Sequence, residues 1–178
     1  MRASYLLEQG KVAIREVDVP QLDADEVLVK VAAVGVCGSD VHYYQHGKIG
    51  PYVVDHPLIL GHELSGTIAA VGADVDASRI GERVAVEPQR PCRECEQCKA
   101  GRYNLCPNIE FYATPPIDGA FAEFVKIQSQ FAFKIPDHVS FEAAALIEPL
   151  SVCIWAAQRA EITKGSRVLI AGAGPIGV

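Results

Sequence analysis

The clearest chemical signal in this sequence is a group of four cysteines out of six, all placed between positions 92 and 106. The segment CRECEQCKAGRYNLC has the spacing C-x2-C-x2-C-x7-C, formed by Cys92, Cys95, Cys98 and Cys106. Zinc binds four thiolates at the corners of a tetrahedron, and two-residue gaps let successive backbone turns present their sulfurs to one point. Disulfides or free thiols are the alternatives, but such crowding in a reducing compartment favours metal. Because four sulfurs leave no open position, we expect a structural zinc site.

A second possible metal set is spread along the chain. Cys37 stands in GVCGSD, and His62 is followed by Glu63 in GHE. A mixed set of thiolate, imidazole and carboxylate with one open position is the composition of a catalytic zinc site. From the residues alone the alternatives stay open, because a lone cysteine is often a buried small hydrophobe and a His-Glu pair is often a surface or capping pair.

The last twelve residues, RVLIAGAGPIGV, read as a buried strand that runs into a glycine-rich turn. Gly172, Gly174 and Gly177 match G-x-G-x-x-G, in which the glycines permit a tight turn, close approach to a pyrophosphate and close helix packing. The helix that would hold the phosphates and the acidic residue expected about twenty residues later do not occur within the 178 residues. We therefore expect the beginning of a dinucleotide site and no more.

The elements that must position these residues are mostly strands. The runs KVAIREVDVP, EVLVKVAAVGV, ELSGTIAAVG, ERVAVEP and FAFKIP are β-branched and roughly alternating, and TPPIDGAFAEFVKI reads as a turn and then a strand. GSDVHYY predicts a short helix with a Ser-Asp pair at its start, and SFEAAALIEPLSVCIWAAQRA predicts a helix broken or kinked at Pro149. The polar segment 89–108 lacks a hydrophobic core of its own and needs another source of stability. This order predicts an antiparallel β domain joined to the first helix and strand of a parallel α/β domain.

Composition and charge exclude several classes of protein. About half of the residues are hydrophobic (49%) and 21% are charged, as in ordinary globular proteins. The net charge of −6 argues against a nucleic-acid surface. The N-terminus lacks the apolar core of a signal peptide, and no run approaches the length of a transmembrane helix. We expect a cytoplasmic protein with no nucleic-acid or membrane partner.

Taken in order, the motifs GVCGSDVHYYQHGKIG, LILGHELSG, the four-cysteine lobe, FYATPPIDGAFAEF, ALIEPLSV and AGAGPIG resemble the zinc-containing medium-chain dehydrogenases, in particular the polyol (sorbitol and xylitol) dehydrogenases. The resemblance covers essentially the whole chain. It implies a mainly β fold, with a GroES-like antiparallel β-barrel catalytic domain at 1–148 and the truncated start of an NAD-binding Rossmann domain at 149–178. Animal sorbitol dehydrogenases do not all keep the four lobe cysteines, so the chain resembles a branch of the family in which zinc stabilises the lobe.

The resemblance also implies roles for individual residues. Cys37 and His62 would bind a catalytic zinc, with Glu63 binding it directly or through water and Glu148 beside the metal-bound water. Ser39 and His42 match positions of a proton relay, although Ser39 could simply cap a helix and His42 could simply be exposed. The positions near the polyol are matched by Tyr44, Phe111 and Thr114, of which the two aromatic residues would otherwise be assigned to the core.

The function implied is oxidation of a polyol to a ketose with transfer of hydride to NAD, using one catalytic and one structural zinc. We expect the full-length parent to be a homotetramer and the 178-residue chain to be inactive by itself, with its tail after Pro149 poorly held. The alternatives are a zinc alcohol or threonine dehydrogenase of the same superfamily, or a non-catalytic zinc-binding module.

Overall fold

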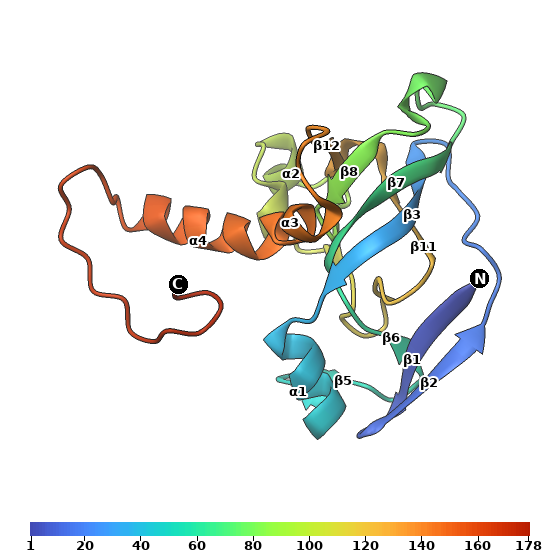
Figure 1. The fold of residues 1–178 in the computed structure, drawn as a ribbon, viewed down its shortest axis with the longest axis horizontal. Coiled ribbons are helices and arrows are strands. Elements are labelled where there is room, and N and C mark those ends of the chain that lie inside the picture. The colour runs from blue at the N-terminus through green and yellow to red at the C-terminus, as the bar shows by residue number, and fades with distance from the viewer.

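Antiparallel strands dominate the first 134 residues in the computed structural model, which describes residues 1–178 (Figure 1). Five strands form one sheet with the order β11-β3-β7-β8-β12, and a smaller sheet has the order β2-β1-β6. Their bounds are β1 (Arg2–Glu8), β2 (Lys11–Glu16), β3 (Glu26–Gly35), β6 (Leu58–Ile59), β7 (Glu63–Val71), β8 (Arg83–Val86), β11 (Phe124–Gln128) and β12 (Ala132–Lys134). Two-stranded pairs are made by β4 (Lys48–Ile49) with β5 (Tyr52–Val53) and by β9 (Gln89–Arg90) with β10 (Glu110–Phe111). The predicted mainly β fold is confirmed.

The main core lies on the inner face of the five-stranded sheet. Alternation in β3 turns Val27 and Val29 inward, where they pack with Leu64 and Ile68 of β7 and with Val84 of β8. All five are essentially excluded from solvent, and full burial of such a side chain contributes about 1.5–3 kcal/mol. This core fixes how β3 and β7 lie against each other.

The register between β3 and β7 decides which residues meet at one end of the sheet. Two irregularities interrupt the pairing, after Leu28 and after Val31, and the pairing then ends with Gly35 opposite Glu63. Cys37 therefore lies just beyond the end of β3, and His62 lies just before the start of β7. Because the strands are antiparallel, these two positions fall at the same edge of the sheet.

Helices flank the sheet at a few places. They are α1 (Gly38–His46), α2 (Glu96–Lys99), α3 (Phe141–Ala145) and α4 (Ile147–Arg159), with single 3-10 turns at η1 (Ala77–Arg79), η2 (Tyr103–Leu105) and η3 (Ser129–Phe131). The Ser140 hydroxyl caps α3 by accepting a hydrogen bond from the amide of Ala143 at 3.1 Å. Helix thus forms over the predicted range 140–160, but the break lies at Leu146 and not at Pro149. Pro149 falls in the first turn of α4, where its missing N–H costs no helical bond.

The strand predicted near Val168 does not form. Figure 1 shows α4 extending away from the sheets and the remaining chain following it as an irregular loop. No residue of α4 is buried, and the apolar Leu169 is fully exposed. A strand needs a neighbour for its backbone hydrogen bonds, and residues 1–178 offer none at this place. None of the helices has both the length and the apolar character needed to cross a bilayer.

Candidate metal centres

Cys37, His62 and Glu63 converge at the edge where β3 ends and β7 begins. Their possible ligand atoms all lie within 4.8 Å of one another. His62 and Glu63 are buried and Cys37 is partly buried. Gly35 is required beside them, because a Cβ atom at that position would collide with the Glu63 carboxylate. We call Cys37, His62 and Glu63 the three-ligand site.

The buried carboxylate of Asp40, for which the sequence predicts only a role at the start of a helix, supports this site. The carboxylate of Asp40 accepts hydrogen bonds from the amides of Cys37 and Gly61, both at 2.9 Å. The same side chain lies 3.9 Å from Nδ1 of His62, which is buried and has no hydrogen-bond partner. A carboxylate behind a histidine ring is the usual support of a metal-bound imidazole, since it fixes the tautomer and the ring orientation. Asp40 therefore holds the two loops that carry Cys37 and His62.

The donor set fits zinc. A thiolate, an imidazole and a carboxylate supply three ligands and leave one coordination position for water or substrate, which is the arrangement of catalytic zinc sites. The unsatisfied and buried Nδ1 of His62 indicates that this imidazole needs a partner in the complete site.

Glu148, in the first turn of α4, lies close enough to the three-ligand site to respond to its charge. Burial, followed by the carboxylates of Glu63 and Glu87, raises the pKa of Glu148 from 4.5 to about 7. Glu148 and Glu87 line one cavity of about 330 Å³ together with Phe111. A carboxyl with a pKa near neutrality can hold or release a proton under physiological conditions. Glu87 was not singled out in the sequence, because nothing in its local spacing marks it.

The four lobe cysteines also converge. The sulfurs of Cys92, Cys95, Cys98 and Cys106 all lie within 4.8 Å of one another, and no disulfide joins them. Cys92 and Cys106 approach to 3.5 Å between sulfurs, close to the spacing of about 3.8 Å between corners of a zinc–thiolate tetrahedron. Hydrogen bonds from the amides of Glu94 and Cys95 lower the pKa of Cys92 to about 6, whereas burial raises the pKa of Cys98. The four sulfurs are thus arranged around one point, where four ligands would close a metal site.

A cavity of about 600 Å³ adjoins the three-ligand site. Ser39, Phe111 and Thr114 line it, and the ring of Phe111 lies 5.5 Å from that of His62. The structure does not bring Tyr44 to this cavity: Tyr43 lines it instead. Consecutive residues of α1 point about 100° apart, so Tyr43 faces this cavity and Tyr44 does not. Tyr44 lines a separate apolar groove with residues of β1 and β2.

The remaining predicted residues lie apart from this cavity. His42 is exposed on α1 and packs against His46, with ring centroids 4.4 Å apart. Gly172 has a positive φ of 107°, as a tight glycine turn requires, and a Cβ at Gly177 would collide with the carbonyl of Gly172. The glycine segment keeps its turn geometry but follows no strand and begins no helix.

Known proteins with sequences similar to this chain agree with this geometry. The family model described as the alcohol dehydrogenase GroES-like domain matches residues 23–137. The chain is 54% identical to the sorbitol dehydrogenase of Bacillus subtilis over 178 residues, which is 100% of this chain and 50% of that protein. It is 49% identical to the D-xylulose reductase of Saccharomyces cerevisiae, over 99% of this chain and 50% of that protein.

A solved structure is similar to this chain as well. An alcohol dehydrogenase from Escherichia coli, determined with the cofactor NADH, superposes with a TM-score of 0.90 at 36% identity, over 99% of this chain and 50% of that chain. The chain thus spans about half the length of the curated relatives it matches.

Proposed function

Because the chain belongs to the alcohol dehydrogenase GroES-like domain family, we propose that it forms the metal- and substrate-binding half of a zinc-dependent polyol dehydrogenase that transfers hydride to NAD. The observation that carries the proposal is the three-ligand site, with its open coordination position, beside the 600 Å³ cavity. The names of the relatives support a polyol as the substrate, and the NADH-bound neighbour supports a nicotinamide cofactor.

In this proposal zinc, when bound, supplies a Lewis acid that lowers the pKa of a substrate hydroxyl. The residues of the chain enclose the substrate and transfer its proton. Phe111, Tyr43 and Thr114 enclose the substrate. The Ser39 hydroxyl at the cavity wall accepts the hydroxyl proton of the substrate as it releases its own proton. His42, on the same helix and exposed, passes that proton to water. The substrate carbon loses a hydride to NAD as its hydroxyl loses the proton, so the alcohol becomes a ketone.

The lobe has a different role in the proposal. A zinc ion held by Cys92, Cys95, Cys98 and Cys106 would brace a segment that has only one short α-helix and a single 3-10 turn. The glycine turn at Gly172–Gly177 would begin the nucleotide site. We propose that NAD binding needs further chain, since within residues 1–178 this turn is not followed by the helix whose N-terminus would hold the phosphates.

The test is a substrate profile of the whole protein that carries this chain. The purified enzyme would be assayed with NAD and NADP against sorbitol, xylitol, ribitol, ethanol and threonine, beside its Cys37→Ser variant. We expect turnover of polyols that depends on Cys37. A two-zinc protein that turns over ethanol or threonine but no polyol would overturn the substrate class, and unchanged activity of the variant would overturn the metal assignment.

A further inference from the structure

A buried carboxylate stands behind the wall of the substrate cavity. Glu26, the first residue of β3, is only 1% exposed. Its carboxylate accepts from the Arg90 guanidinium at 2.7 Å, from the Lys126 ammonium at 2.8 Å and from the Asp23 amide at 3.0 Å. A buried charge is stable only when it is paired and hydrogen-bonded on all sides, as Glu26 is. This cluster serves neither metal site directly, so its position calls for another explanation.

The first branch of the cluster leads to the strand that carries Phe111. Arg90 lies in β9, and a second nitrogen of its guanidinium lies 3.4 Å from the carboxylate of Glu110 in β10. The two strands pair with Arg90 opposite Glu110 and Gln89 opposite Phe111. Because a planar guanidinium can hold two carboxylates in fixed directions, Arg90 ties β10 to Glu26.

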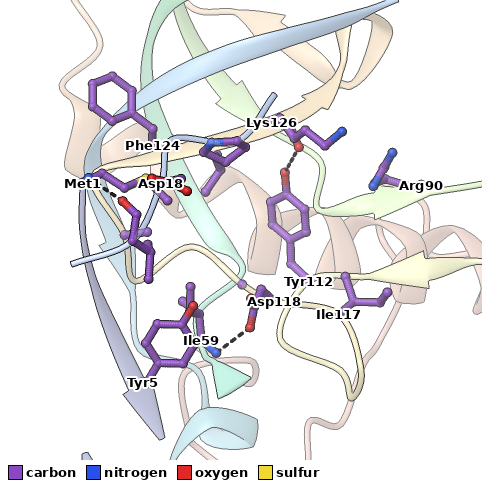
Figure 2. Close-up of a pocket in the computed structure, with 15 residues that line it drawn as sticks. Met1, Tyr5, Asp18, Ile59, Arg90, Tyr112, Ile117, Asp118, Phe124 and Lys126 are labelled. Atoms are coloured by element: carbon purple, nitrogen blue, oxygen red, sulfur yellow. Dashed lines mark hydrogen bonds between the residues drawn. The ribbon is translucent and has the colours of Figure 1, made fainter. Parts of the chain in front are cut away.

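The second branch leads to the next residue of the same wall. Lys126 lies in β11, and its backbone carbonyl accepts a hydrogen bond of 2.5 Å from the hydroxyl of Tyr112 (Figure 2). Tyr112 is buried, and burial raises the pKa of its hydroxyl, so the hydroxyl stays a donor. Burial alone would lower the pKa of Lys126, but its bonds to Glu26 and Asp23 outweigh this effect and raise it.

The two branches meet on the back of the cavity wall. The continuous segment 109–117 lines the 600 Å³ cavity beside His62. Arg90 and Lys126 line another cavity, of about 290 Å³, in which Tyr112 and Ile117 also take part (Figure 2). Tyr112 and Ile117 therefore border both cavities, and the ion cluster contacts the wall from the side away from the metal ligands.

We propose that Glu26 is a positioning residue for the substrate cavity: through Arg90 and Lys126 it holds the wall that carries Phe111 and Tyr112 against the three-ligand site. The inference rests on the proposed function, because that function makes this cavity the substrate site. Glu26 touches neither substrate nor metal. Its loss should weaken the binding of substrate and leave the chemical step largely intact.

The variant Glu26→Gln keeps the shape of the side chain and removes its charge. The control is Glu82→Gln, since Glu82 also pairs with one arginine and one lysine, Arg79 at 2.8 Å and Lys134 at 3.8 Å, and does not line the substrate cavity. In the whole enzyme we expect Glu26→Gln to raise the polyol KM about tenfold with kcat within about twofold, the pattern of lost uniform binding. Glu82→Gln should leave both within about twofold.

A polyol KM for Glu26→Gln that equals that of Glu82→Gln would overturn the inference. Arg90→Lys gives a second test if the first variant folds poorly, because lysine keeps the positive charge beside Glu26 but cannot hold two carboxylates in fixed directions. We expect Arg90→Lys to raise the polyol KM about fivefold. An unchanged KM would contradict the inference. A wild-type enzyme without polyol turnover would instead refute the proposed function.

Amide hydrogen exchange needs no turnover. It therefore distinguishes a failure of this inference from a failure of the proposed function. The Tyr112 amide donates to Pro88 at 2.9 Å, and the Ile68 amide donates to Glu82 at 2.9 Å in the main sheet. In Glu26→Gln we expect exchange at Tyr112 to be at least about tenfold faster while exchange at Ile68 is unchanged. Equal acceleration at both amides, or none at Tyr112, would mean that Glu26 has a general structural role or no role in holding the wall.

Discussion

Replacing Glu148 with glutamine tests whether the carboxyl beside the three-ligand site is held neutral by its surroundings. Burial, then Glu63, then Glu87 raise the pKa of Glu148 from 4.5 to about 7 in the folded protein. The folded state therefore binds a proton that the unfolded state loses between pH 4.5 and 7. Its contribution to stability is fully present below pH 4.5 and is lost as the pH rises through 7.

The size of this effect follows from the shift in pKa. A tenfold change in the ionisation constant corresponds to about 1.4 kcal/mol, so an increase from 4.5 to about 7 gives an upper limit of about 3.4 kcal/mol. Because the side chain is only partly buried, water screens the interaction, and we expect about 1–2 kcal/mol of unfolding free energy to be lost between pH 5 and pH 8. Glutamine cannot ionise, so Glu148→Gln should lose this slope.

The assay is urea unfolding from pH 5 to pH 8 in a Cys37→Ser background with zinc kept in the lobe, so that no cation offsets the charge of Glu63. The difference in unfolding free energy between Glu148 and its Gln variant should change by about 1–2 kcal/mol across this range. Equal pH slopes for the two proteins would refute the reasoning. A zinc ion at the three-ligand site should flatten the slope of the parent, because it counters the neighbouring carboxylates.

Three further predictions concern the supports of the site and the core. Gly35→Ala should lower zinc affinity at the three-ligand site at least about tenfold, since its Cβ would displace the Glu63 carboxylate; chelator competition measures this, and unchanged affinity would argue against the placement of Glu63. Asp40→Ala should lower the same affinity about 10–100-fold, and an effect on the lobe zinc instead would contradict the assigned role. Leu64→Ala should cost about 2–5 kcal/mol in urea unfolding, whereas Leu150→Ala on exposed α4 should cost less than about 0.5 kcal/mol; similar costs would show that the core is misplaced.

Much of the fold could be predicted because the signals are local. Alternation in EVLVKVAAVGV marks β3, and the C-x2-C-x2-C-x7-C spacing marks the lobe without knowledge of any other segment. The strand predicted near Val168 was wrong because a strand is completed by its neighbours, and the apolar run alone cannot supply them. Cys37 and His62 have no local signal for a shared site, and only the resemblance joined them.

Finer features of the site depend on three-dimensional register. The choice between Tyr43 and Tyr44 turns on a rotation of about 100° along α1, which the motif does not resolve. Asp40 gave only a capping signal, since its contact with His62 requires the register of β3 against β7. Glu26 gave no signal at all, because its partner Arg90 stands 64 residues away.

The most direct test of the account is the number of zinc ions per chain, measured by native mass spectrometry on the protein and on two variants. We predict two zinc ions in the wild type, one in Cys37→Ser and one in Cys92→Ser, with the chelator-resistant ion lost only from Cys92→Ser. A wild type with a single zinc ion, or a Cys37→Ser variant that keeps two, would contradict the assignment of separate catalytic and structural metal sites.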